Sequence, residues 1–508
     1  MHFNFEGEIS GRSTSHHLFE LCGPATVTIF SNLADPTDLD ALRDAIATAS
    51  DACQLTPLDL AVLTISASAT DSLVEVITGL LPESATARAH VFVLVDSTRI
   101  ERAGRDLKAD VASMLEHAFS VTTVVLGNDH HLQADDTAID TATESLAGAD
   151  CIVTVGGGTI TDIGKVASHR LGNIPLVVVQ TAASVDGFTD NVSVLLRNGV
   201  KRTEPSRWPD AVLADTITIA EAPIAMNKAG FGEVLSLYTA PADWKLAYLL
   251  GHDASFNRTP RDFLLEFAGD PTEWAAGIQS RDPQSIGHLT RVLAIRGIGT
   301  GIAGSTACLS GVEHLISHML DMYATSHDEE MGYHGAQVGV ASVVASTIWQ
   351  YFTERLADGL GEVSFPEAAS LEAQVRSAFA RCDPSGEKGA ECWNDFSTKL
   401  AVWNGNRSRI LDVLGQWNAS HRDIALAIPS PESLAINLRS AGAPADPSSL
   451  GEWVSEDVWH WAIKNSHFMR NRLTIVDVLF FLGWWTDIDV AGVIARAQVS
   501  SSGLLDVR

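Results

Sequence analysis

The chain has 508 residues, which is enough for two or three domains. Its 63 acidic residues against 34 basic ones give a formal net charge of −29, which repels polyanions and argues against nucleic acid as a partner. An acidic proteome produces the same balance without functional meaning, so the charge identifies no partner by itself.

The apolar runs are all too short to cross a bilayer, and the first residues lack a basic segment followed by an apolar one. The six cysteines include no C-x-x-C pair, which is typical of free thiols in a reducing compartment. We therefore expect a cytoplasmic protein with no membrane insertion.

Residues 1–75 mix short apolar runs with polar stretches and carry no chemical motif. Four apolar runs rich in β-branched residues follow, and they predict buried strands at 90–96, 120–127, 150–155 and 174–179. Helical stretches separate these runs, and such alternation is typical of a Rossmann-like parallel sheet. After a last short run at 211–215, the apolar spacing is helical.

The sequence therefore predicts three parts. Residues 1–75 form an N-terminal extension of unclear role, residues 76–217 an α/β domain with a Rossmann-like parallel sheet, and residues 218–508 an all-α domain. A cleft between the last two parts is where we expect a cofactor and a substrate to meet.

A glycine-rich turn, GGGTITD, follows the third predicted strand and opens a helix. Glycines at such a turn let the backbone approach a pyrophosphate, and the helix N-terminus supplies amide donors. The spacing is not G-x-G-x-x-G, so a plain strand-to-helix turn remains an alternative. After the fourth strand come Thr181, Ser184 and Asp186, which suit contacts to cofactor and substrate or, alternatively, a helix cap.

The helical half contains a dispersed set of metal-ligand residue types. Glu233 is expected at the start of an apolar helix, His314 and His318 stand four residues apart on one helical face, and His334 begins the next helix. A carboxylate and two imidazoles with an open position suit a catalytic divalent metal, whereas a lone histidine is more often a polar core residue. The histidine pairs at 16–17 and 130–131 lie in polar stretches, and we expect both to be exposed.

Taken in order, these motifs resemble the dehydroquinate synthase/iron-containing alcohol dehydrogenase superfamily, and within it the sn-glycerol-1-phosphate dehydrogenase family. Two more stretches resemble that family: the Asp243-Trp244 helix, and the segment 463–477 with Arg470-x-Arg472, where Leu473 replaces an aromatic residue. The resemblance extends from about residue 76 to 490 and implies a dehydroquinate synthase-like fold.

The resemblance also implies roles for individual residues. Glu233, His314 and His334 match the metal ligands, although the family usually has aspartate at the first position and the synthase branch has glutamate. His318 matches a proton relay and Asp186 a position beside the substrate. The residues that match cofactor contacts are Asp96, Gly156, Gly157, Gly158, Asp162, Thr181 and Ser184. An acid at position 96, after the first clear strand, favours NAD over NADP.

We therefore expect an NAD(P)-dependent oxidoreductase with one divalent metal ion, zinc being favoured over nickel or iron. The expected reaction interconverts sn-glycerol 1-phosphate and dihydroxyacetone phosphate, and the expected assembly is a homo-oligomer, with a dimer favoured. The candidate partners for the phosphate are Lys201, Arg202, Arg470 and Arg472, and a solvated surface role is the alternative for each of them.

Three alternatives remain open. One is a glycerol or polyol dehydrogenase acting on an unphosphorylated substrate. Another is a sugar-phosphate cyclase of the synthase type, because the synthase branch has glutamate at the position of Glu233. The third is a nucleotide-binding protein without turnover, which the complete set of candidate residues disfavours.

Overall fold

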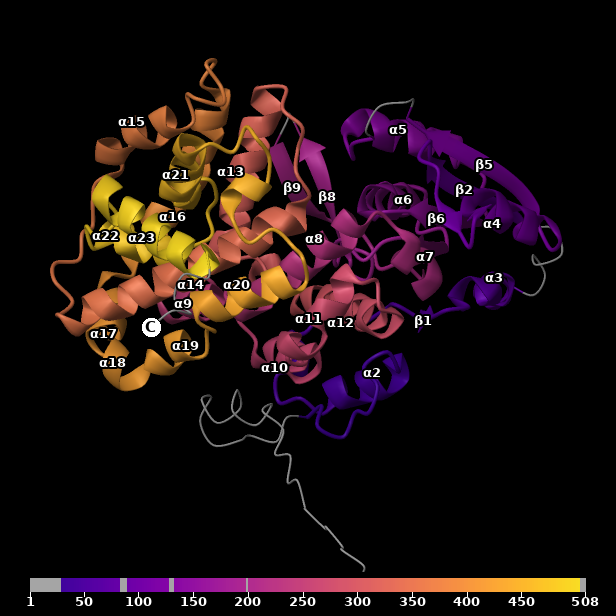
Figure 1. Ribbon diagram of the computed structural model, residues 1–508, viewed down its shortest axis with the longest axis horizontal. Helices are drawn as coiled ribbons and strands as arrows, with labels where there is room; N and C mark the ends of the chain where they lie inside the picture. The colour runs from indigo at the N-terminus through magenta and orange to yellow at the C-terminus, as the bar shows by residue number, and fades with distance from the viewer. Residues whose placement is uncertain (1–28, 83–88, 128–131, 198–199, 503–508) are drawn as a thin grey trace, which may run out of the picture.

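The computed structural model describes residues 29–82, 89–127, 132–197 and 200–502 (Figure 1). The histidine pairs at 16–17 and 130–131 therefore lie outside the described residues. Within these ranges the central feature is a six-stranded sheet in which every neighbouring pair is parallel. In spatial order its strands are β1 (Val62–Ser66), β10 (Ala211–Asp215), β7 (Leu176–Gln180), β6 (Cys151–Gly156), β2 (His90–Asp96) and β5 (Ser120–Leu126).

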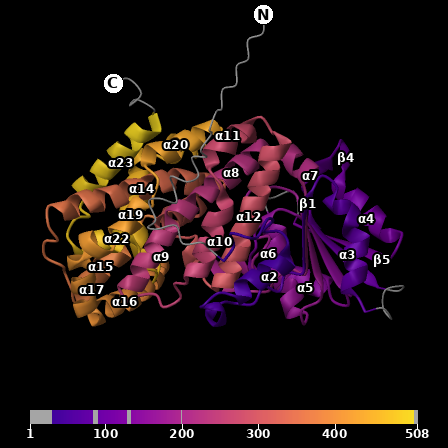
Figure 2. The same cartoon turned by 90° about the horizontal axis from the view of Figure 1, so that it is seen from below.

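The two faces of the sheet carry different apolar side chains, as the two-residue period of a strand requires. Val91, Val93 and Val95 of β2 pack on one face, and Phe92 and Leu94 pack on the other. Helices α3 (Leu73–Leu80) and α4 (Leu107–Glu116) cover the first face, and α5 (Asp136–Ser145) and α6 (Gly158–Arg170) cover the second (Figure 2). Burial on both faces explains why the central strands are continuous apolar runs.

The predicted fold class is confirmed, and the four predicted strands appear at nearly the expected bounds. Two features differ from the expectation. Strand β1 comes from the stretch before residue 76 and pairs with β10, so the N-terminal part contributes to the sheet. An antiparallel hairpin of β8 (Val192–Arg197) and β9 (Val200–Pro205) follows β7, and its mixture of charged and apolar residues gave no strand signal.

After β10 the described chain is helical. The helices that form the site are α8 (Ile224–Val234), α12 (Pro283–Ala303), α13 (Val312–Ser326) and α14 (His334–Ala357). Across the described ranges, no helix combines the length and apolar character needed to span a membrane.

The remaining α-helices pack around these four; those from α15 onward lie on the far side of the molecule from the sheet, whereas α2 and α7 lie near the sheet (Figure 1). They are α2 (Leu39–Ala47), α7 (Thr216–Glu221), α9 (Ala240–Leu249), α10 (Arg258–Ala268), α11 (Pro271–Gln279), α15 (Ala368–Ala378), α16 (Glu387–Gly405), α17 (Arg407–Gly415), α18 (Trp417–Ser420), α19 (Arg422–Leu426), α20 (Pro431–Ser440), α21 (Glu456–Asn465), α22 (Ile475–Phe481) and α23 (Asp487–Ser502).

Candidate active site

A cavity of about 1500 Å³ lies between the sheet and the helical half. Eleven of the twelve predicted site residues line it, and the twelfth, Gly156, is the last residue of β6. The eleven are Asp96, Gly157, Gly158, Asp162, Thr181, Ser184, Asp186, Glu233, His314, His318 and His334. The sheet contributes through the carboxyl ends of β2, β6 and β7, which is where open α/β sheets bind ligands.

The glycine turn places the N-terminus of α6 at this cavity. A Cβ atom at Gly158 would lie 3.0 Å from the Val185 side chain, so packing restricts that position. A Cβ atom at Gly157, by contrast, would meet nothing nearer than Met226 at 4.0 Å. The protein itself therefore leaves space at Gly157, at the end of a 13-residue helix whose free N–H groups attract an anion.

Two acidic residues beside this turn are already bound to protein groups. Asp162 lies 3.4 Å from Lys165 and accepts a hydrogen bond from the Val194 backbone at 3.3 Å. Burial raises the pKa of Asp162 to about 7, against the influence of Lys165. Asp96 pairs with Lys108 at the end of β2. Both side chains line the cavity, and through these contacts they hold the neighbouring segments of its wall together.

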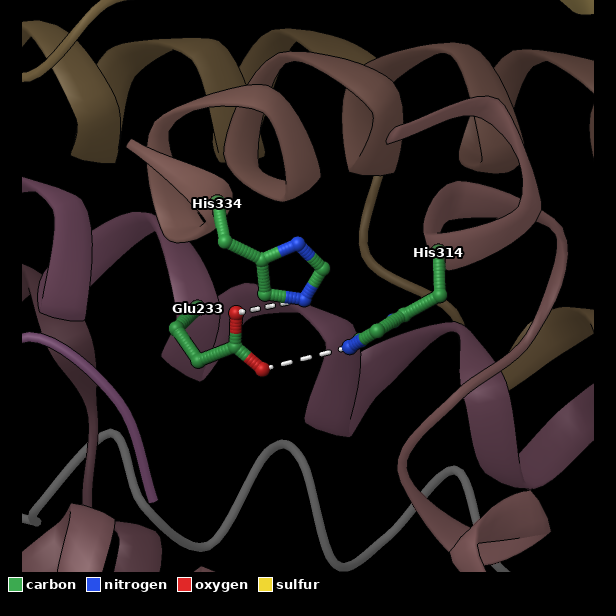
Figure 3. A group of neighbouring side chains, drawn as sticks. All are labelled: Glu233, His314 and His334. Atoms are coloured by element: carbon green, nitrogen blue, oxygen red, sulfur yellow. Dashed lines mark hydrogen bonds and ion pairs between the residues drawn. The ribbon is translucent and has the colours of Figure 1, made fainter. Parts of the chain in front are cut away.

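Glu233, His314 and His334 meet at the other end of the cavity (Figure 3). His314 Nε2 lies 3.2 Å from Glu233 Oε1, and His334 Nε2 lies 3.7 Å from Glu233 Oε2. One ligand atom from each residue falls within 4.8 Å of the others. Glu233 Oε2 is buried and accepts no hydrogen bond, so the carboxylate has an oxygen to offer a cation.

Glu233 lies at the end of α8, so the expectation that it starts a helix was wrong, whereas His334 begins α14 as expected. Backbone contact between these two helices fixes Glu233 opposite His334. A Cβ atom at Gly232 of α8 would lie 2.2 Å from the Gly335 carbonyl oxygen, and one at Gly335 of α14 would lie 2.1 Å from the Ala229 carbonyl oxygen. Only glycine permits this approach, since real Cβ atoms do not come so close to other atoms. The crossing therefore sets the distance between a carboxylate on one helix and an imidazole on the other.

Glu313 orients His314 and was not singled out in the sequence. Its side chain is fully buried and lies 3.0 Å from His314 Nδ1, 2.9 Å from the Thr239 hydroxyl and 2.6 Å from the Gly311 N–H. A carboxylate at Nδ1 holds the proton there, which leaves the Nε2 lone pair for a metal. The adjacent Glu-His pair in the sequence is the signal that points to this arrangement.

The charges of the site alter its pKa values. Burial raises the pKa of Glu233, but His314, His334 and Arg296 outweigh burial and hold it below its usual value. Burial lowers the pKa of His314, but Glu233 and Glu313 raise it to about 9. The two glutamates thus favour a proton on His314, which a bound metal ion would displace.

Arg296 is a second residue that sequence reasoning missed. It lies within the apolar helix α12 and is fully buried. Its Nη2 atom lies 2.9 Å from Glu233 Oε1 and 3.1 Å from Asp186 Oδ2. Burial raises the pKa of Asp186 to about 6, although Arg296 opposes that rise. An arginine in the middle of the apolar stretch 292–303 of α12 was the available signal, although that stretch does not indicate the partners of the arginine.

His318 lies one turn beyond His314 and faces the cavity. Its ring stacks on that of His334, with centroids 5.5 Å apart, while the His314 ring is 6.4 Å away. His318, Asp321 and His334 also place ligand atoms within 4.8 Å of one another. The structure thus brings His318 beside the predicted metal ligands without making it part of the Glu233 group.

Asp243 connects the two further stretches noted in the sequence, the Asp243-Trp244 helix and the segment 463–477. Its two carboxylate oxygens accept hydrogen bonds from the backbone N–H groups of Val312 and Ile475, each at 2.9 Å. Val312 begins α13 and Ile475 begins α22. One buried side chain therefore caps two helices and holds α13, the helix of His314, in place.

The four predicted phosphate partners differ in position. Arg472 donates to the Ser310 carbonyl and, at 2.7 Å, to the Thr306 hydroxyl, and both of these residues line the cavity. Arg202 pairs with Glu391 and Asp395. Burial, Arg202 and Arg472 lower the pKa of Arg470 to about 10. The Lys201 side chain lies outside the described residues.

Comparison with known proteins identifies the family of this chain. The iron-containing alcohol dehydrogenase family matches residues 68–223. A glycerol-1-phosphate dehydrogenase [NAD(P)+] from Methanosarcina acetivorans is 30% identical over 290 residues, which cover 56% of this chain and 76% of the relative. The chain belongs to the glycerol-1-phosphate dehydrogenase family.

A further relative and one solved structure extend the comparison. A glycerol-1-phosphate dehydrogenase [NAD(P)+] from Geobacillus thermodenitrificans is 26% identical over 388 residues, covering 76% of this chain and 85% of the relative. A probable glycerol dehydrogenase from Sinorhizobium meliloti has the same fold, with a TM-score of 0.54 at 16% identity, covering 87% of this chain and 97% of that one. The family predicted from the sequence is therefore confirmed.

Proposed function

We propose that this protein is a metal-dependent, NAD(P)-linked dehydrogenase that interconverts sn-glycerol 1-phosphate and dihydroxyacetone phosphate. The observation that carries the proposal is that one cavity joins the glycine turn of α6 to the Glu233–His314–His334 group. The family relatives, which are named for this activity, support it. In this proposal residues 76–217 bind the cofactor, and residues 218–508 hold the metal and the substrate.

The residues present fit a divalent metal ion. Glu233 Oε2 is buried without a hydrogen bond, and Glu313 leaves the Nε2 atom of His314 available. One oxygen and two nitrogen donors suit zinc, nickel or iron(II), and we favour zinc. A bound metal ion would act as a Lewis acid that lowers the pKa of the substrate hydroxyl.

The glycine turn fits a dinucleotide. The open space at Gly157 and the N–H groups that begin α6 would receive the pyrophosphate, and Thr181 and Ser184 would contact the part of the cofactor nearer the substrate. Bound NAD(P) would supply the hydride acceptor. Asp96 lines the cavity beyond the glycine turn, where an acid suits the adenine ribose of NAD.

We assign to His318 the transfer of the proton that the reaction releases or takes up. During oxidation the substrate C2–H bond loses a hydride to the nicotinamide, and the hydroxyl proton must leave to a base. His318 lines the cavity beside His314 and His334 and would accept this proton, then return it during ketone reduction. Asp186 faces the same space and would position the substrate.

For the phosphate group we propose the wall formed by Thr306 and Ser310. Because the Thr306 hydroxyl accepts a hydrogen bond from Arg472, its own proton is available to donate into the cavity. Arg472 supplies positive charge behind this wall, and among the described residues no salt bridge to Arg472 is found. A cation without a carboxylate partner next to a polar cavity wall favours an anionic substrate.

The test compares NAD(P)H oxidation with dihydroxyacetone phosphate and with unphosphorylated dihydroxyacetone, on metal-loaded and on chelated protein. We expect turnover of the phosphate, loss of turnover on chelation and much weaker turnover of dihydroxyacetone. Equal turnover of the two ketones would favour the polyol dehydrogenase instead. The synthase-type cyclase regenerates its NAD, so net oxidation of added NAD(P)H would exclude it.

A further inference from the structure

Arg296 connects two acidic residues of the cavity through one nitrogen atom. Its Nη2 lies 2.9 Å from Glu233 Oε1 and 3.1 Å from Asp186 Oδ2, so those two oxygens are at most about 6 Å apart. Its Nη1 donates to the Ser236 hydroxyl at 3.1 Å. The guanidinium is fully buried and lies behind the two carboxylates, while both carboxylates line the cavity.

Backbone packing holds the Asp186 loop against α12 at this point. A Cβ atom at Gly297 would lie 2.4 Å from the Asp186 carbonyl oxygen and 2.3 Å from the Thr189 hydroxyl. The Thr189 hydroxyl also donates to the Ala294 carbonyl at 2.7 Å. The arrangement is therefore built by close contact between helix and loop, and it does not depend on the reach of one flexible side chain.

This geometry places an additional carboxylate close to the proposed metal ligands. A divalent cation attracts nearby carboxylates, and its affinity rises with the number of charged ligands. A catalytic site, however, needs a small set of protein ligands, so that a position stays available for substrate. Asp186 is near enough to Glu233 to occupy the coordination position that the substrate needs. To stay out of that position, the Asp186 carboxylate must be paired with a cation of the protein.

We propose that Arg296 keeps Asp186 out of the metal coordination shell, so that Glu233 is the only carboxylate that binds the ion. This inference rests on the proposed function, because it takes Glu233, His314 and His334 as the ligands. Arg296 is then a positioning residue. It satisfies Asp186 in the cavity wall and leaves Oε2 of Glu233 directed towards His334.

The test measures zinc affinity by competition with a chelator in the wild type, Arg296→Met, Asp186→Asn and the double variant. Methionine fills a similar volume and removes the charge, so Asp186 becomes free to bind the ion. We expect Arg296→Met to bind zinc about 10-fold more tightly, a change of the size that outer-shell residues produce. The additional Asp186→Asn substitution should abolish the gain, because an amide is a poorer ligand.

Cobalt(II) substitution gives a readout that is independent of turnover. The visible absorption of bound Co²⁺ weakens as its coordination number rises, so we expect a weaker band in Arg296→Met than in the wild type or the double variant. Arg291→Met is the matched control, because Arg291 lies on the same helix, and it should leave affinity and spectrum unchanged. If Arg296→Met does not fold, as judged by circular dichroism, Arg296→Gln replaces it.

The outcomes separate the two claims. Zinc binding in the wild type with no gain in Arg296→Met overturns this inference and leaves the proposed function intact. A gain that persists in the double variant also overturns it, since charge alone would then explain the effect. A wild-type protein that binds no divalent metal overturns the proposed function and this inference together.

Discussion

Glu313→Gln removes the charge that orients His314 while preserving the size of the side chain. The Glu313 carboxylate is fully buried and lies within hydrogen-bond distance of His314 Nδ1, the Thr239 hydroxyl and the Gly311 N–H. Glutamine keeps one acceptor oxygen, so only part of this network is lost. We expect the free energy of unfolding of the metal-free protein to fall by about 1–3 kcal/mol, the usual cost of one lost bond to a charged group.

The larger effect should be on metal binding. A carboxylate at Nδ1 raises the basicity of the imidazole and fixes its tautomer, and loss of such a partner weakens metal affinity by about 10–100-fold. That change corresponds to about 1.4–2.7 kcal/mol of binding free energy. Competition with a chelator measures the zinc affinity, and thermal unfolding of the metal-free protein measures the structural cost separately.

The control is Glu329→Gln, an exposed glutamate that follows α13 and should leave zinc affinity unchanged. If Glu313→Gln binds zinc as tightly as the wild type, the buried carboxylate does not orient a ligand, and the assignment of His314 to the metal is contradicted. Weakened binding in both variants would instead indicate a general effect of lost negative charge.

The remaining predictions concern packing, phosphate and cofactor. Gly335→Ala places a Cβ atom 2.1 Å from the Ala229 carbonyl oxygen, so we expect a loss of about 1–3 kcal/mol in unfolding free energy by denaturant titration; unchanged stability would contradict the close helix crossing. Arg472→Met should raise KM for dihydroxyacetone phosphate by about 10-fold or more and leave the weak rate with dihydroxyacetone unchanged, because the charge behind Thr306 is lost. An equal effect on the two ketones would exclude Arg472 from phosphate binding. Gly157→Ala should leave Tm unchanged, since its Cβ atom meets nothing nearer than 4.0 Å, but should raise the Kd for NAD(P)H in a fluorescence titration. A lower Tm with unchanged Kd would show that Gly157 serves the fold.

The sequence predicted those parts of the fold that depend on local pattern. Strands buried on both faces, such as β6, are continuous apolar runs and were recognised at nearly the right bounds. The hairpin of β8 and β9 was missed because charged and polar side chains interrupt its apolar residues. Strand β1 was not assigned to the sheet because its pairing with β10 joins residues far apart in the chain.

In the site, too, residues in short local patterns could be predicted, whereas roles that depend on contacts between distant segments could not. Motif residues such as His314 and His334 could be predicted because they stand in recognisable short patterns. Arg296 could not, because its role depends on the close contact of α12 with the Asp186 loop, which no local pattern records. The function of Glu313 likewise depends on Thr239, which lies on a distant part of the chain.

The most direct test of the account is the product formed from dihydroxyacetone phosphate and NAD(P)H by chelated protein and by the same protein after zinc is restored. Chiral analysis of the glycerol phosphate identifies the enantiomer. We predict sn-glycerol 1-phosphate from the zinc-restored protein and none from the chelated protein. Formation of sn-glycerol 3-phosphate, or undiminished turnover after complete removal of metal, would contradict the proposed function.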